Sequence, residues 1–214
     1  MAPLVAELHP AGARGPRVEA FEHPRHSIDV LATGVGMVAT AAWCGRILGA
    51  GRYDLALNLG VCGSFDPALG LGTSVHVVSD CLAELGAEDG DAFLSVHDLG
   101  LLGRDEFPFR DGRLVNHAPP ANATLAQLTA VRGITVNTVH GREASIAAVA
   151  ERVAPQVESM EGAAFMYTCL IAGVPFAQVR TVSNIVERRD RERWRMAAAV
   201  QALGSTAMAL LESA

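Results

Sequence analysis

The chain has 214 residues, half of them hydrophobic and 19% charged, so it is long enough for one folded domain and too apolar to be disordered. Its formal net charge of −6 argues against a nucleic-acid binder, which needs a basic surface to neutralise phosphates. All 17 basic residues are arginines, which excludes a lysine Schiff base, a P-loop lysine and a lysine general base.

Short β-rich runs alternate with segments of helical spacing along most of the chain. Strands are predicted over 27–34, 55–61, 73–80, 133–139 and 175–182. Helices are predicted over 37–48, 143–153, 161–172 and from about 190 to the C-terminus, with Gly49, Pro155 and Gly173 as stop signals. This alternation predicts one α/β domain over residues 1–214 with a largely parallel central sheet.

Residues 85–120 fit this alternation poorly because they are rich in glycine and proline. A surface excursion with a hairpin and a lid lent to a neighbouring subunit are both open interpretations of this segment.

The four cysteines are widely spaced and form no CxxC pair, so we expect reduced thiols without a zinc site: Cys44, Cys62, Cys81 and Cys169. No apolar run reaches the length of a bilayer, and the N-terminus lacks a signal segment. We therefore expect a soluble cytoplasmic protein with no metal or cofactor and with neither nucleic acid nor membrane as a partner.

Two segments where predicted strands end or helices begin carry candidate ligand-binding residues, since function in α/β folds concentrates there. Within "NLGVCGSF", Gly60 and Gly63 predict a turn whose backbone amides can approach a ligand, although an ordinary glycine turn is the better explanation of this segment taken alone. In "ESMEGAAF", Glu158 and Glu161 flank a methionine where a helix begins. The helix dipole alone can explain a glutamate at this position, because it stabilises acidic residues at a helix N-terminus. The small and apolar neighbours nevertheless indicate a function for Glu161.

A third segment, "RTVSNIVERRDRERW", follows the last predicted strand. Arg180 ends an apolar run and should be buried, and a buried arginine needs an anionic or polar partner. The arginines that follow are most simply a solvated helix face: Arg188, Arg189, Arg191, Arg193 and Arg195.

With "VNTVHGREASI", these segments make the chain resemble the nucleoside phosphorylase/nucleosidase superfamily and, within it, the futalosine hydrolase family. The resemblance implies a three-layer α/β/α domain with a mixed central sheet, in a protein that is usually a homo-oligomer. It also implies hydrolysis of the N-glycosidic bond of futalosine, which releases hypoxanthine in the alternative menaquinone pathway.

The resemblance assigns roles around the sugar of a purine nucleoside substrate. Glu161 matches a glutamate that holds the ribose hydroxyls, Met160 lies against the sugar, and Arg180 stands near the ribose and the attacking water. Val61, Cys62 and Gly63 match a glycine-rich turn that lies beneath the sugar.

At the base, Asn184 falls where adenine-specific nucleosidases carry an aspartate that protonates the purine. An asparagine offers a donor and an acceptor, which suits a 6-oxopurine such as hypoxanthine. Ala144, Ser145 and Ile146 match the loop that borders the base. Several relatives stack an aromatic ring on the base from this loop, whereas this chain has Ser145.

Futalosine ends in a benzoate, and arginine can clamp a carboxylate while tryptophan covers the aryl ring. We expect Arg189, Arg191 and Trp194, at the start of the last helix, to hold this tail, with Arg110 of the excursion as an alternative. The family also begins with a strand and an acid that orients the attacking water, before a segment resembling "APL". Here "APL" follows Met1, so that strand and acid are expected to be missing, and Glu7 lies beyond the matching turn.

Two further interpretations stay open. One is another 6-oxopurine nucleosidase or a nucleoside phosphorylase. The other is a truncated, non-catalytic nucleoside-binding homologue, which the missing acid would explain.

Overall fold

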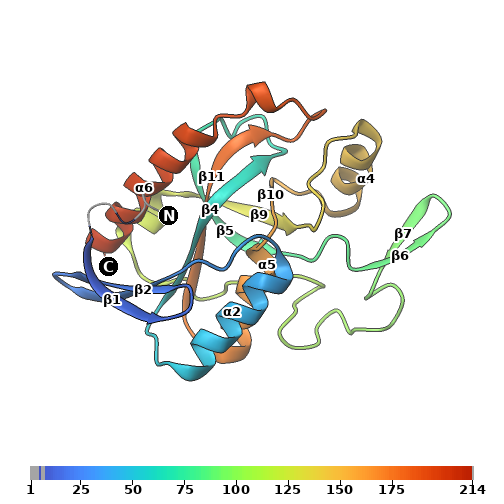
Figure 1. Cartoon of the computed structure of the whole chain (residues 1–214). Coiled ribbons are helices and arrows are strands. Elements are labelled where there is room, and N and C mark those ends of the chain that lie inside the picture. Colours follow the sequence, from blue (N-terminus) through green and yellow to red (C-terminus); the bar gives the residue numbers. More distant parts are fainter. Residues whose placement is uncertain (1–4, 6–7, 214) are drawn as a thin grey trace.

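The computed structural model describes Val5 and residues 8–213, so Glu7 lies outside the described residues. At its centre is a mixed sheet (Figure 1). Its strands are, in spatial order, β11 (Phe176–Ile185), β4 (Ala56–Ser64), β10 (Val157–Ser159), β9 (Thr129–Thr135), β5 (Ser74–Asp80) and β8 (Leu114–Val115).

The sheet closes on itself. β11 pairs in parallel with β4 on one side and antiparallel with β5 on the other, so β11, β4, β10, β9 and β5 form a ring. β10–β9 and β9–β5 are also parallel, whereas β10–β4 and β5–β8 are antiparallel. Val75, Val131 and Val182 are among the buried side chains of one apolar cluster shared by these strands. The α/β class predicted from the sequence and the mixed sheet implied by the resemblance are confirmed. The sheet is less parallel than expected, because β10–β4, β5–β8 and β11–β5 are antiparallel.

Helices cover the sheet from opposite sides (Figure 1). α2 (Met37–Ala50) packs against α5 (Gly162–Ala172), and α6 (Met196–Glu212) packs against β11 and β4. α3 (Ala123–Gln127) lies beside α6, and α4 (Glu143–Val153) follows β9. The layers are joined by apolar contacts, such as those of Phe165 with Phe176 on the α5 side and of Val179 with Leu203 on the α6 side.

The first predicted strand is present but lies outside the central sheet. β3 (His26–Leu31) belongs to a separate antiparallel sheet with β1 (His9–Gly15) and β2 (Val18–His23). The β1–β2 connection is a tight turn in which Gly15 and Arg17 both have positive φ angles, of 148° and 64°. Such short connections join antiparallel neighbours, so these strands pair with one another and not within the alternating βα scheme.

The last helix begins six residues later than predicted. Residues Arg191–Arg193 form a short 3₁₀ turn (η1), and Asp190 caps it by accepting a hydrogen bond from the backbone nitrogen of Glu192 at 3.0 Å. The nitrogen of Arg195 donates to the carbonyl of Ser183 at 2.8 Å, which holds the segment against the end of β11. The arginine-rich segment is therefore a loop before α6, and its arginines do not open the helix.

Residues 85–120 contain a hairpin, made of β6 (Gly86–Asp89) and β7 (Ala92–Ser95), followed by an irregular segment that leads to β8. In Figure 1 the hairpin projects from the body of the domain beside α4. Among the described residues, no helix combines the length and the hydropathy that crossing a membrane requires.

Candidate active site

A buried polar network fixes the start of α5 and thereby places Glu161. Asp80 is fully buried and accepts hydrogen bonds from Gln178 Nε2 at 2.9 Å and from Thr135 Oγ1 at 3.0 Å, and its burial raises its pKa. A side chain at Gly162 would overlap Asp80 and Gln178. Only glycine therefore lets α5 begin this close to the sheet, with Glu161 as its N-cap residue.

Glu161 and Arg180 meet over Gly60. One carboxylate oxygen of Glu161 accepts from the backbone nitrogen of Gly36 at 3.1 Å, and the other lies 3.6 Å from Nη1 of Arg180. Arg180 lies opposite Gly60 in the β11–β4 pair, and a methyl group on Gly60 would overlap its guanidinium. The structure thus brings together two of the predicted catalytic residues from different elements.

Arg180 keeps hydrogen-bonding capacity that the described residues do not use. Its side chain is 3% exposed, and neither Nε nor Nη2 has a partner among the described residues. Buried donors on a cation are costly unless they are paired. Since Glu161 is 20% exposed beside them, this is a place where hydroxyl groups or an anion can be bound.

The predicted glycine turn is instead continuous strand. Val61, Cys62 and Gly63 all lie within β4, which runs to Ser64, so the expectation of a turn was wrong. The strand continues because β11 and β10 pair with it on both sides up to Ser64. Burial raises the pKa of the Cys62 thiol to about 12, which favours the neutral thiol over the nucleophilic thiolate. Met160 is partly buried between β10 and Glu161.

Asn184 lies against Gly63, the opposite residue on β4. A side chain at Gly63 would stand 3.1 Å from Nδ2 of Asn184 and 3.5 Å from Cγ of Glu158, so both side chains flank this glycine. Three residues of β4, roughly 10 Å, separate Gly63 from Gly60. In the described part of the chain, no hydrogen bond joins Asn184 to Glu161 or Arg180, so the two groups mark separate ends of the site.

Sequence reasoning missed a histidine that pairs with Glu158. His140 donates its backbone nitrogen to one oxygen of Glu158 at 3.1 Å, and its Nδ1 lies 2.7 Å from the other. The side chain of His140 is 11% exposed and that of Glu158 is 3% exposed. The motif "VNTVHGREASI" contains His140, but its pairing with Glu158 depends on the contact of two distant segments.

The segment matched to the base edge is the first turn of α4. Ser145 donates its hydroxyl to the carbonyl of Arg142 at 2.9 Å, and the nitrogen of Ile146 donates to the same carbonyl at 3.0 Å. Ala144 is exposed. This turn follows the loop that carries His140.

The arginine-rich loop lies across from that same loop. The nitrogen of Arg189 donates to the carbonyl of Gly141 at 3.4 Å, and its guanidinium lies over the ring of Trp194 at 5.0 Å. The structure therefore brings together Arg189 and Trp194, whereas Arg191 is exposed in η1. Arg110 is exposed within the excursion.

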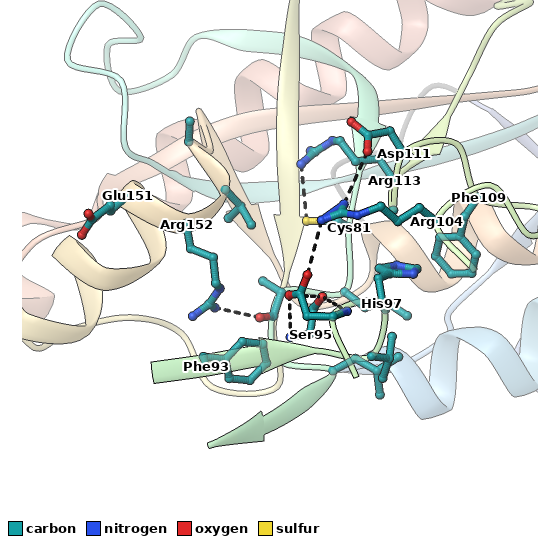
Figure 2. Close-up of a pocket in the computed structure, with 18 residues that line it drawn as sticks. Cys81, Phe93, Ser95, His97, Arg104, Phe109, Asp111, Arg113, Glu151 and Arg152 are labelled. Carbon is teal, nitrogen blue, oxygen red and sulfur yellow. Dashed lines mark hydrogen bonds and ion pairs between the residues drawn. The ribbon is translucent and has the colours of Figure 1, made fainter. Parts of the chain in front are cut away.

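A separate cavity of about 430 Å³ lies between the β6–β7 hairpin, the irregular segment and the end of α4 (Figure 2). Most of its charged groups have partners: Arg104 pairs with Asp98 at 3.5 Å and with Asp111 at 3.4 Å, and Arg113 donates to the carbonyl of Gly133 at 2.7 Å. None of the predicted site residues lines this cavity. It is therefore distinct from the candidate active site.

No cluster of three metal-ligating side chains occurs within the part of the chain that the structure describes.

Comparisons with known proteins identify the family to which the chain belongs. The phosphorylase superfamily profile matches residues 3–213. A futalosine hydrolase from Streptomyces coelicolor is 38% identical over 186 residues, which are 82% of this chain and 74% of that protein. A futalosine hydrolase from Thermus thermophilus is 32% identical over 184 residues, 85% of this chain and 80% of that protein.

The fold is similar to that of solved nucleosidases. The structure of a futalosine hydrolase from Helicobacter pylori superposes with a TM-score of 0.79 at 13% identity, covering 98% of this chain and 91% of that one. A methylthioadenosine/S-adenosylhomocysteine nucleosidase from Colwellia psychrerythraea gives a TM-score of 0.74 at 19% identity, with 98% and 92% covered. The chain therefore belongs to the phosphorylase superfamily and, within it, to the futalosine hydrolase family.

Proposed function

We propose that this protein hydrolyses the N-glycosidic bond of futalosine, releasing hypoxanthine and dehypoxanthine futalosine in menaquinone biosynthesis. The similarity to futalosine hydrolases over most of the chain supports the substrate. The observation that carries the chemistry is the Glu161–Arg180 pair, a partly exposed carboxylate beside a buried cation whose Nε and Nη2 have no partner among residues 8–213.

The pair suits the sugar end of this reaction. Cleavage of a purine nucleoside passes through a state with positive charge on the ribose and negative charge on the departing base. A carboxylate that accepts hydrogen bonds from the ribose hydroxyls stabilises the positive side, because the charges attract most strongly where water is excluded. The spare donors of Arg180 can hold the attacking water or a hydroxyl close to the sugar.

The test is release of hypoxanthine from futalosine, followed by chromatography. Glu161→Gln keeps the shape of the side chain but removes the charge, and we expect kcat/KM to fall about 100- to 1,000-fold, which is about 3–4 kcal/mol of transition-state stabilisation. Glu151→Gln is the matched control, because Glu151 is exposed on α4 and lies along the other cavity. A Glu161→Gln protein with turnover near that of the parent would refute the assignment.

Phosphorolysis is a second candidate, and the unused donors of Arg180 favour it because they could equally bind phosphate. The sugar product separates the two reactions: hydrolysis yields a free sugar with or without phosphate, whereas phosphorolysis needs phosphate and yields a sugar 1-phosphate. A non-catalytic protein would bind hypoxanthine and release none from futalosine.

We also propose that the protein works in the cytoplasm as a homo-oligomer. Large apolar side chains are exposed on neighbouring elements, with Val38 of α2 at 83% and Ile171 of α5 at 55%. Such apolar surface favours association with a second copy. Sedimentation of the purified protein tests this, and a monomer at micromolar concentration would contradict it.

A further inference from the structure

We propose that His140 is the acid that protonates the departing purine and that Glu158 is its positioning residue. This inference rests on the proposed N-glycosyl hydrolysis and identifies the group that acts at the base end. It starts from the fact that Asn184 cannot act as an acid. A carboxamide can donate a hydrogen bond but cannot give up a proton at neutral pH.

The local contacts of Asn184 fix the orientation of its amide. Its Oδ1 accepts a hydrogen bond from Ser183 Oγ at 3.0 Å, and its Nδ2 donates to the carbonyl of Ile185 at 3.1 Å. The amide is thereby held in one orientation, with one N–H of Nδ2 left for a ligand. The position can hold a base but cannot complete its departure by proton transfer.

His140 is linked to the end of the site that carries Asn184 through its hydrogen-bond partner Glu158. Glu158 lies across from Gly63 in the β10–β4 pair, and Asn184 lies across from Gly63 in the β11–β4 pair. The space that a side chain at Gly63 would occupy is bordered by Val186, Asn184 and Glu158, so Asn184 and Glu158 border the same space. The loop that carries His140 is also tied to the arginine-rich loop, through the bond between Gly141 and Arg189.

The contacts of His140 leave one ring nitrogen available. Nδ1 faces a carboxylate oxygen of Glu158 at 2.7 Å and so carries a hydrogen, because a carboxylate can only accept. Nε2 has no hydrogen-bond partner within the described part of the chain. The proton that a charged imidazole can deliver is therefore the one on Nε2, while Glu158 holds the ring in place. The edge of the Phe65 ring lies against the imidazole, with 6.2 Å between ring centroids.

The paired donors also match a 6-oxopurine. On the edge of such a base that carries N7, both N7 and O6 are acceptors, whereas adenine presents an acceptor and an amino donor there. Nε2 of a charged His140 and Nδ2 of Asn184 are two donors, so they fit N7 and O6 together. This pair provides a physical reason for preference toward hypoxanthine.

The proposed step balances as follows. The bond between C1′ and N9 breaks, and its electron pair goes to the purine. The Nε2 proton of His140 moves to N7, which leaves neutral hypoxanthine and a neutral imidazole. Water adds to C1′, its extra proton goes to solvent, and His140 is protonated again from solvent.

The test compares two leaving groups. Futalosine releases a purine that benefits from protonation, whereas p-nitrophenyl riboside releases a stable anion that does not. The variant is His140→Asn, because an asparagine nitrogen can replace Nδ1 in the bond to Glu158 but leaves nothing at the position of Nε2. We expect kcat/KM for futalosine to fall about 100- to 10,000-fold, and for the nitrophenyl riboside to stay within about threefold.

Controls separate this inference from the proposed function. His117→Asn changes an exposed histidine after β8 and should leave both substrates unaffected. If the parent protein cleaves neither substrate, the proposed function fails. If the parent cleaves both and His140→Asn slows both equally, or slows neither, the role of His140 is overturned. If His140→Asn does not fold, His140→Gln is measured instead, since its amide reaches the Nε2 position without an acidic proton, and the same criteria apply.

Discussion

Replacing Gly60 with alanine should abolish most activity while leaving the fold intact. A methyl group at this position would overlap Nη1 of Arg180 and come within 3.1 Å of Cζ. Non-bonded atoms of this kind pack best at about 3.5 Å or more, so Nη1 must retreat by more than about 1 Å. Nη1 now lies 3.6 Å from Glu161, and the same movement changes the position of the cation relative to that carboxylate.

The expected loss follows from that displacement. Misplacing a catalytic group by about 1 Å costs about 100-fold in rate, so we expect kcat/KM for futalosine to fall about 100-fold. The obstructed atoms are the end of a side chain and not backbone, so the melting temperature should fall by only a few degrees.

The assay is steady-state release of hypoxanthine, with thermal unfolding measured on the same samples. Gly49→Ala is the matched control, because a side chain there meets nothing within 4 Å and the position is inside α2, where alanine is favoured. A folded Gly60→Ala protein with kcat/KM within threefold of the parent would show that the position of Arg180 does not govern the reaction.

Three further predictions concern the base, the tail and acid stability. Asn184→Asp should shift preference from inosine toward adenosine in a competition assay, because a carboxylate facing O6 places two acceptors together; an unchanged ratio would show that Asn184 does not read the base. Arg189→Ala should raise KM for futalosine about tenfold and leave inosine unaffected, since inosine lacks the benzoate, whereas the exposed Arg191→Ala should change KM less; equal effects on both substrates would place the tail elsewhere. Burial lowers the pKa of His76, so the unfolded chain binds more protons as the pH falls below about 6.5, and stability is lost in that direction. His76→Leu should therefore lose less stability than the parent between pH 7 and pH 5 in urea unfolding, and parallel losses would contradict this.

Local sequence signals were enough for the α/β class and for several element boundaries. α5 ends at Ala172 with Gly173 in the left-handed conformation, at φ 65°, as glycine at a helix end predicts. The apolar runs at 55–61 and 175–182 both became central strands. The second is buried on both faces, whereas residues 56–61 of the first are partly buried. The charged stretch after β11 misled the prediction of the last helix, since Asp190 caps a short 3₁₀ turn and Met196 begins the helix.

The site was predicted in part. Glu161 and Arg180 stand out in the sequence because each is a charged residue within an apolar run, and the structure brings them together over Gly60. The functional roles of these and of the other candidate residues stay predictions until the substitutions are measured.

Other features depend on contacts between segments that are far apart in the chain. β10 has only three residues, too few for a periodic signal, and it is a strand because β9 and β4 hold it from both sides. The closure of the sheet through β11 and β5, and the pairing of His140 with Glu158, likewise join residues separated by loops and helices. Periodicity and capping report only on neighbours along the chain, whereas these contacts arise when packing buries the strands and leaves each polar group to find a partner in space.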